Sequence, residues 1–479
     1  MKKMIIKTKQ IISFMLASVC ILGIVGCSVK GNSFEDNTQQ VGADTTALEK
    51  AYIYTLPLAM IDATMEKSTN TVEATQNSAP VNQVFHLRQL ANADSKLVVT
   101  PNVDTVYSQS YLDLSQEAAM ILEKPFSDRY YMIQVMNAYS DTLAILGTGT
   151  DGQEKNTYLI TRENYTGEIP SDVQHIKSNT DLVWIIIRII SNGEEDLPNI
   201  HALQDATQVM PLKNYISGEA YVPSKGTYDE AKNFVPVEHI MGMGAKEYFD
   251  NVNALMLENP PKEDDSEIMK VLETVNVGPG LTFDETILGE DLEKAWGEVK
   301  KNANAIATKK TVEFNTINGV WSYFDSPIGN FGTEYEYRAI VALNGLGANP
   351  IEAAIYAKTD KDTNGDALNG ENTYKIHFAA NELPPVEDYG FWSITIYGED
   401  QFLIPNSDNI YAINDRTPFI KNEDGSLDLY ISQELPDGVE KANWLPVVDD
   451  QFHLFLRIYR PTTDVINGTW KAPTVEPYN

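Results

Sequence analysis

The stretch Leu182-Val183-Trp184-Ile185-Ile186-Ile187-Arg188-Ile189-Ile190 is a nearly continuous run of apolar, mostly β-branched residues. Such a run predicts a strand that is buried on both faces, because a half-exposed strand would alternate polar and apolar side chains. Two further strands are predicted before it. Residues 106–112 alternate, and residues 129–136 are aromatic and β-branched. With a helix predicted at 48–65, we expect a first β-rich domain over residues 46–215.

The chain changes character after this domain. Apolar residues at helical spacing predict helices at 237–257, 267–275 and 290–308, the first of them stopped by Pro260 and Pro261. We interpret residues 216–310 as a helical connection between or beside the β domains. From residue 311 the sequence again favours short strands separated by Gly, Pro, Asn and Asp. The clearest lie at 335–341, 373–378, 391–397 and 451–459, and this spacing predicts a second, antiparallel sandwich domain over 311–479.

The N-terminus has the pattern of a secretory signal. Four lysines and no acid precede an apolar stretch that is too short for a convincing membrane span. The stretch ends Ile24-Val25-Gly26-Cys27, which resembles the lipobox of bacterial lipoproteins. The resemblance implies a signal peptide at 1–26 and a lipid on Cys27. Residues 27–45 are polar and predict a flexible tether. We therefore expect an extracytoplasmic protein held to the membrane by its lipid.

Composition excludes several kinds of site. The chain has 479 residues, a formal net charge of −32 and two cysteines, Cys20 and Cys27. Loss of the signal and lipidation of Cys27 would leave no free thiol, which excludes disulfides, cysteine nucleophiles and Cys-bound metals. The acidic surface repels nucleic acid, so no nucleic-acid partner is expected. No cofactor motif is identified.

Ordered motifs run through both β-rich parts of the chain. The first part contains Asn102-Val103-Asp104-Thr105-Val106-Tyr107-Ser108 and Arg129-Tyr130-Tyr131, and the second contains Phe391-Trp392-Ser393 and Leu456-Arg457-Ile458-Tyr459-Arg460-Pro461. Together they resemble the bacterial family in which domain of unknown function 1254 is followed by domain of unknown function 1214. The resemblance covers most of the mature chain. It implies a mainly β fold of two antiparallel jelly-roll-like β-sandwich domains joined by a helical connection, α+β overall, and it implies no agreed activity.

Polar and aromatic side chains interrupt the predicted strands. Arginines within or beside apolar strands must find partners, because an unpaired buried charge is costly, and Asp104 is a candidate partner. Either these residues form a pocket in which arginine holds an anionic or carbonyl group above aromatic side chains, or they are a structural network. The candidate ligand-binding residues are Asn102, Asp104, Thr105, Tyr107, Arg129, Tyr131, Arg188, Arg338, Trp392 and Arg457.

One segment matches the spacing of a calcium loop. Alternate oxygen ligands, a central glycine and a closing carboxylate suit calcium, and the candidate ligands are Asp360, Asp362, Asn364, Asp366 and Glu371. The flanking residues look like strands and not like the helices of an EF-hand. A plain turn rich in Asp and Asn is therefore the alternative.

Three functions remain open from the sequence. The first is a cell-surface module for ligand binding or assembly, with an unknown small molecule, glycan or protein as partner. The second is an envelope-associated hydrolase or other modifying enzyme with a polar pocket in or between the β domains. The third is a calcium-stabilised structural lipoprotein. Sandwich folds host many functions, so the fold alone does not choose between them.

Overall fold

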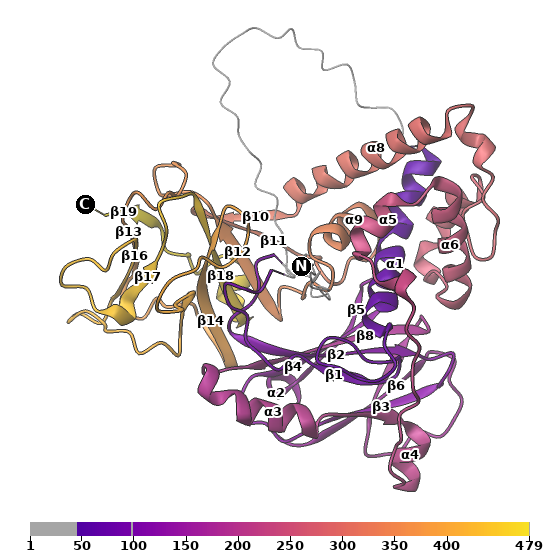
Figure 1. The fold of residues 1–479 in the computed structure, drawn as a ribbon, viewed down its shortest axis with the longest axis horizontal. Coiled ribbons are helices and arrows are strands. Elements are labelled where there is room, and N and C mark those ends of the chain that lie inside the picture. Colours follow the sequence, from indigo (N-terminus) through magenta and orange to yellow (C-terminus); the bar gives the residue numbers. More distant parts are fainter. Residues whose placement is uncertain (1–45, 97–98, 479) are drawn as a thin grey trace, which may run out of the picture.

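The structure is a computed structural model that describes residues 46–96 and 99–478. The predicted signal peptide, Cys27 and the tether lie outside the described residues. Within the described part the fold is α+β, with four sheets and a layer of helices (Figure 1). No helix in that part of the chain is long and apolar enough to cross a membrane.

The first sheet is built around the apolar run 182–190. This run forms β8, and all nine of its residues are buried, as the sequence predicts. It pairs antiparallel with β2 on one side and β4 on the other. The strand order is β1 (Val84–His86), β2 (Thr105–Asp113), β8 (Leu182–Ile190), β4 (Tyr131–Asn137) and β5 (Thr142–Gly147).

The two faces of β8 enter different cores. Val183, Ile185, Ile187 and Ile189 pack against a second sheet, whereas Trp184 packs with helices. This double burial explains why the strand shows no alternation of polar and apolar residues. The order of the second sheet is β7 (Gln174–Ser178), β6 (Asn156–Arg162), β3 (Ala119–Lys124) and β9 (Gln208–Pro211). We call these two sheets the first module.

A helical layer covers the Trp184 face of the first sheet (Figure 1). The layer consists of α1 (Ala47–Thr69), α5 (Pro236–Gly242), α6 (Ala245–Glu258), α7 (Ser266–Glu273), α8 (Leu292–Glu313) and α9 (Tyr335–Asn344). The helix predicted at 48–65 is confirmed as α1, which begins with a capping box between Thr46 and Glu49. The single helix predicted at 237–257 is wrong, because α5 ends at Gly242 and Met243-Gly244 separates it from α6.

The second module is a pair of sheets that pack face to face around one apolar core. The larger has the order β10 (Asn315–Asn318), β11 (Trp321–Phe324), β12 (Ala354–Thr359), β18 (Phe452–Pro461), β14 (Val386–Gly398) and β15 (Ala412–Asn414). The smaller has the order β17 (Trp444–Pro446), β16 (Leu427–Ser432), β13 (Tyr374–Phe378) and β19 (Val475–Pro477). The strands predicted at 373–378, 391–397 and 451–459 are confirmed.

Two pairings depart from the antiparallel arrangement expected from the sequence. β6 pairs with β7 in parallel, and so does β16 with β17, so these sheets are mixed. The jelly-roll connectivity that the family resemblance implies stays a prediction. The remaining short helices are α2 (Thr148–Asp151), α3 (Leu197–Ala206), α4 (Leu212–Ser217), α10 (Thr463–Ile466), η1 (Glu194–Asp196), η2 (Glu230–Lys232), η3 (Glu263–Asp265), η4 (Glu285–Leu288) and η5 (Lys441–Asn443).

The strand predicted at 335–341 is wrong, because these residues begin helix α9. Tyr337, Ile340 and Val341 lie three and four residues apart and enter the core of the second module. Ala339 and Ala342 enter the core of the helical layer. A helix between two cores has apolar residues on both faces, and in a short segment this pattern resembles a β-strand. Tertiary packing here overrides the strand preference of the aromatic and β-branched residues.

Candidate functional site

A cleft of about 880 Å³ lies between the first module and the second. The first module supplies the loop 90–94, Val103 and the loop 191–194 to its wall. The second module supplies segments around β15 and before β17. Side-chain amides are prominent in the wall and come from both modules: Asn92, Asn192, Asn406, Asn409 and Asn414. This size is typical of pockets for small molecules, and clefts between domains are a common place for them.

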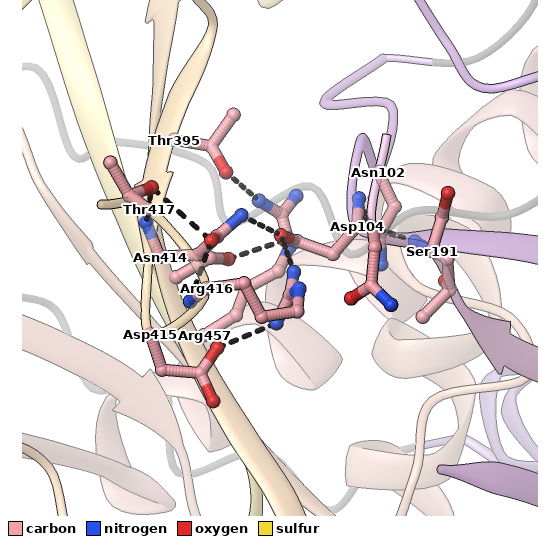
Figure 2. A network of polar contacts seen from close by, with 12 residues as sticks. Asn102, Asp104, Ser191, Thr395, Asn414, Asp415, Arg416, Thr417 and Arg457 are labelled. Atoms are coloured by element: carbon pink, nitrogen blue, oxygen red, sulfur yellow. Dashed lines mark hydrogen bonds and ion pairs between the residues drawn. The ribbon is translucent and has the colours of Figure 1, made fainter. Parts of the chain in front are cut away.

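Asp104 joins the two modules beside this cleft, at the start of β2 (Figure 2). Its side chain is fully buried. One carboxylate oxygen, Oδ2, accepts a hydrogen bond from Ser393 Oγ at 2.5 Å. The other, Oδ1, accepts from Asn414 Nδ2 at 3.1 Å and from the Arg416 guanidinium at 2.9 Å. All three partners belong to the second module, so we call this set the Asp104 latch.

Arg416 lies between two carboxylates (Figure 2). One terminal nitrogen contacts Asp104, and the other contacts Asp415 at 2.6 Å. The guanidinium also lies over the ring of Phe391, 4.9 Å from its centroid. Burial raises the pKa of Asp415 to about 6; Arg416 opposes this rise, and the nearby Asp104 adds to it. The arrangement therefore places a carboxyl group with a raised pKa next to Asn414 and Arg416, which line the cleft.

The residues just before Asp104 are also bound by the second module. Arg457 donates to the carbonyl oxygen of Thr100 at 3.0 Å, and Tyr397 OH donates to that of Pro101 at 2.7 Å. Asn102 Nδ2 donates to Tyr459 OH at 2.6 Å, and Asn102 Oδ1 accepts from the backbone N–H of Asp104 at 2.6 Å. Residues 100–104 are thus a structural contact between the modules.

Arg188 and Tyr107 face each other on neighbouring strands, as their pairing register requires. The Arg188 guanidinium lies 5.6 Å from the centroid of the Tyr107 ring. It donates to Gln134 Oε1 at 3.0 Å and to Asn349 Oδ1 at 3.3 Å. These residues form a buried polar group near the contact between the modules.

Other residues predicted as ligand-binding have separate environments. Arg129 forms an ion pair with Asp196, and Tyr131 OH shares a hydrogen bond of 2.5 Å with Thr207. Trp392 packs in the core of the second module. These contacts are structural. Thr105 is buried in β2, and Arg338 lies in α9, among tyrosines of the helical layer.

The partner of Asp104 was not predicted from the sequence. One of the arginines in or beside strands was expected, whereas the ion pair is made by Arg416, in the turn after β15. Arg416 also lines the cleft, as does Asn414 of the same turn. The sequence correctly indicated that a buried Asp104 needs a cationic partner. The partner could not be chosen, because 312 residues separate the pair and turn residues give no periodic pattern.

The Asp-rich segment is a loop between strands β12 and β13 and lacks the flanking helices of an EF-hand. Asp362 is buried, and its Oδ1 accepts the backbone N–H groups of Asn364 at 2.8 Å and Asp366 at 3.0 Å. Across the described residues, no group of three or more His, Cys, Asp or Glu side chains could hold a metal ion. In this geometry Asp362 stabilises a turn.

Replacing Asp362 with alanine is expected to lower the free energy of unfolding by about 1–3 kcal/mol, because two backbone donors lose a charged acceptor. The loss should be the same in calcium and in chelator. Urea unfolding under both conditions measures it, with Asp360→Ala as the control because that side chain is exposed. A calcium-dependent stabilisation of the parent protein that either substitution removes would instead support a metal site.

The comparisons with known proteins agree with the two-module architecture. Two family models match: "Protein of unknown function (DUF1254)" at residues 81–211 and "Protein of unknown function (DUF1214)" at residues 353–463. No curated protein matches. The crystal structure of the VPA0106 protein from Vibrio parahaemolyticus is 21% identical, covers 90% of this chain and 99% of its own, and has a TM-score of 0.69.

A second solved structure, of a putative uncharacterized protein from Burkholderia cenocepacia, is 9% identical. It covers 89% of this chain and 88% of its own, with a TM-score of 0.40. The likeness to the Vibrio protein extends over nearly its whole length and shows a shared fold. The order of the two matched models is the order expected from the sequence motifs. The chain therefore belongs to the family in which a DUF1254 module is followed by a DUF1214 module.

Proposed function

We propose that this protein binds a small polar ligand in the cleft between its modules, and that a glycan fragment fits the cleft best. The carrying observation is the set of asparagines contributed by both modules. Asn192 makes no side-chain hydrogen bond within the described protein, and the Nδ2 groups of Asn92 and Asn409 have no acceptor there, so these amides can bond the hydroxyl groups of a sugar. The amides of Asn406 and Asn414 are instead held by hydrogen bonds within the protein. Trp444 and Tyr411 add aromatic surface to the same wall.

The proposed location of the protein is the outer side of the cytoplasmic membrane. The sequence pattern that ends at Cys27 supports a lipid anchor, and the polar residues 27–45 support a tether. The membrane would then be a partner through the lipid alone. The strongly acidic composition disfavours nucleic acid as a partner.

Binding can be measured by calorimetric titration with N-acetylglucosamine oligosaccharides, with maltose as a second sugar. Asn192 lies in the cleft wall, and its side chain makes no hydrogen bond within the described protein. We expect Asn192→Leu to weaken binding about tenfold, which corresponds to about 1.4 kcal/mol. Asn77→Leu, at an exposed position outside the cleft wall, should bind as the parent does. Absence of binding, or equal binding by both variants, would contradict the proposal.

A second candidate function is hydrolysis of such a ligand. Asp415 favours it, because a carboxyl group with a pKa near 6 can donate a proton at neutral pH. With p-nitrophenyl glycosides we expect a rate that falls as the pH rises through about 6, and that Asp415→Asn removes. A rate that Asp415→Asn leaves unchanged would limit the cleft to binding.

A further inference from the structure

Arg188 is a buried cation with neutral neighbours. Only 5% of its surface is exposed. Its hydrogen bonds go to the amide oxygens of Gln134 and Asn349 and, at 3.4 Å, to the carbonyl oxygen of Gly347. Among the described residues, no carboxylate lies within 4.0 Å of its guanidinium. Burying a charge without a counter-charge is costly, so this position calls for an explanation.

Of the other two deeply buried arginines, Arg338 has a carboxylate of the described residues within 4.0 Å and Arg457 does not. Arg338 has a carboxylate oxygen of Asp141 at 3.6 Å. Arg457 interacts electrostatically with Asp104, and it donates to Thr395, Thr100 and Tyr397. Arg188 and Arg457 thus both lack a carboxylate within 4.0 Å in the described part of the chain, but Tyr397 beside Arg457 donates its proton to the carbonyl oxygen of Pro101.

Tyrosine hydroxyl groups around Arg188 provide further hydrogen-bond donors. The Tyr107 ring lies 5.6 Å from the guanidinium, and Asn349 bonds both Arg188 and Tyr356. The Tyr459 ring centroid lies 5.8 Å from that of Tyr356. The hydroxyl oxygen of Tyr356 accepts from Asn349, and those of Tyr107 and Tyr459 accept from Asn102. A hydroxyl group that accepts a hydrogen bond still has its own proton to donate. In the described part of the chain none of the three protons has an acceptor.

A cation and three unused O–H donors in one place match an anion. We propose that Arg188, Tyr107, Tyr356 and Tyr459 form a binding site for a small carboxylate. Its planar oxygens suit both a guanidinium and hydroxyl donors. Tyr107 and Tyr356 are only half-buried. Tyr356 packs against the same aromatic cluster as Val103, which lines the cleft, so the site lies behind the cleft wall.

The test is a thermal-shift titration of the purified protein with sodium acetate and sodium benzoate, against sodium chloride at equal ionic strength. We expect a rise in Tm with one of the carboxylates and none with chloride. Arg188→Gln should lose the rise. Arg457→Gln, which removes an equally buried arginine, should lower the starting Tm and keep the rise. An equal rise with chloride, or a rise that Arg188→Gln retains, would overturn the proposal.

Two further measurements keep the test decisive. Crystals of the parent protein soaked in bromoacetate should show anomalous bromine density beside Arg188. Bromine density only at other places would contradict the proposed site. This measurement does not depend on whether the Arg188→Gln variant folds. The cleft variant Asn192→Leu should keep the carboxylate-induced rise in Tm. Because that variant is expected to weaken sugar binding, failure of the glycan proposal and failure of the carboxylate site give different results.

Discussion

Replacing Asp104 with alanine is expected to lower the free energy of unfolding by about 3–5 kcal/mol, the range for breaking a buried ion pair by removing one partner. The Asp104 side chain is fully buried, and it is the shared acceptor for Ser393, Asn414 and Arg416. Alanine would leave these donors without their acceptor, and all three belong to the second module. The damage should therefore concentrate at the contact between the modules.

Denaturant unfolding followed by tryptophan fluorescence and by circular dichroism measures this loss. We expect the two signals to separate in Asp104→Ala, because the modules then unfold less cooperatively. Asp415→Ala is the matched control: it removes the other carboxylate on Arg416, but the Asp415 side chain is 31% exposed. Its effect should stay below about 1 kcal/mol. An equal decrease in the free energy of unfolding for the two variants would show that burial of the Asp104 latch does not stabilise the protein.

Replacing Trp184 with alanine is expected to cost about 3–5 kcal/mol, as for other large aromatic side chains removed from a core. Trp184 is 1% exposed and is stacked on Tyr111, with ring centroids 5.5 Å apart. Its indole N–H donates to Gln109 Oε1 at 3.0 Å. A Cβ added to Gly347 would lie only 3.1 Å from this ring, so the surroundings fit it closely. The cavity left by alanine would lie between the first sheet and the helical layer.

Chemical denaturation of the purified Trp184→Ala variant measures the decrease in the free energy of unfolding, with Trp470→Ala as the control. Trp470 is half-buried, and its indole N–H donates to a backbone carbonyl, that of Glu382, at 3.0 Å. Its removal deletes the same chemical group from a less enclosed place, and the loss should be clearly smaller. A loss below about 1.5 kcal/mol for Trp184→Ala would mean that sheet and helices are not held together through this residue.

Elements with one dominant pattern could be predicted from the sequence. The apolar run of β8 and the helical spacing of α1 each depend on a periodicity that survives in the fold. Helix α9 could not be predicted, because its two apolar faces belong to two different cores. The break between α5 and α6 had a visible signal in Gly242 and Gly244, which the longer apolar spacing concealed.

The candidate site was less predictable than the fold. Asn102, Asp104 and Arg457 were predicted to form either a ligand pocket or a structural network, and the structure brings them to one contact between the modules. The cleft itself is lined by loops such as 191–194 and by the turn that contains Arg416. Loops and turns acquire their neighbours only from the tertiary structure. A single sequence therefore indicates that such residues exist but not which of them meet.

The contact made by residues 100–104 has a consequence for biosynthesis. Thr100 meets Arg457 across 357 residues, and Asp104 meets Ser393 across 289 residues. Because the ribosome makes the chain from the N-terminus onward, most of the chain is synthesised before these partners exist. Contacts between residues so far apart in the sequence form late in folding. Until they form, the first module is incompletely packed and exposes apolar surface. We therefore expect the growing chain to need a holding chaperone until its last strands are made.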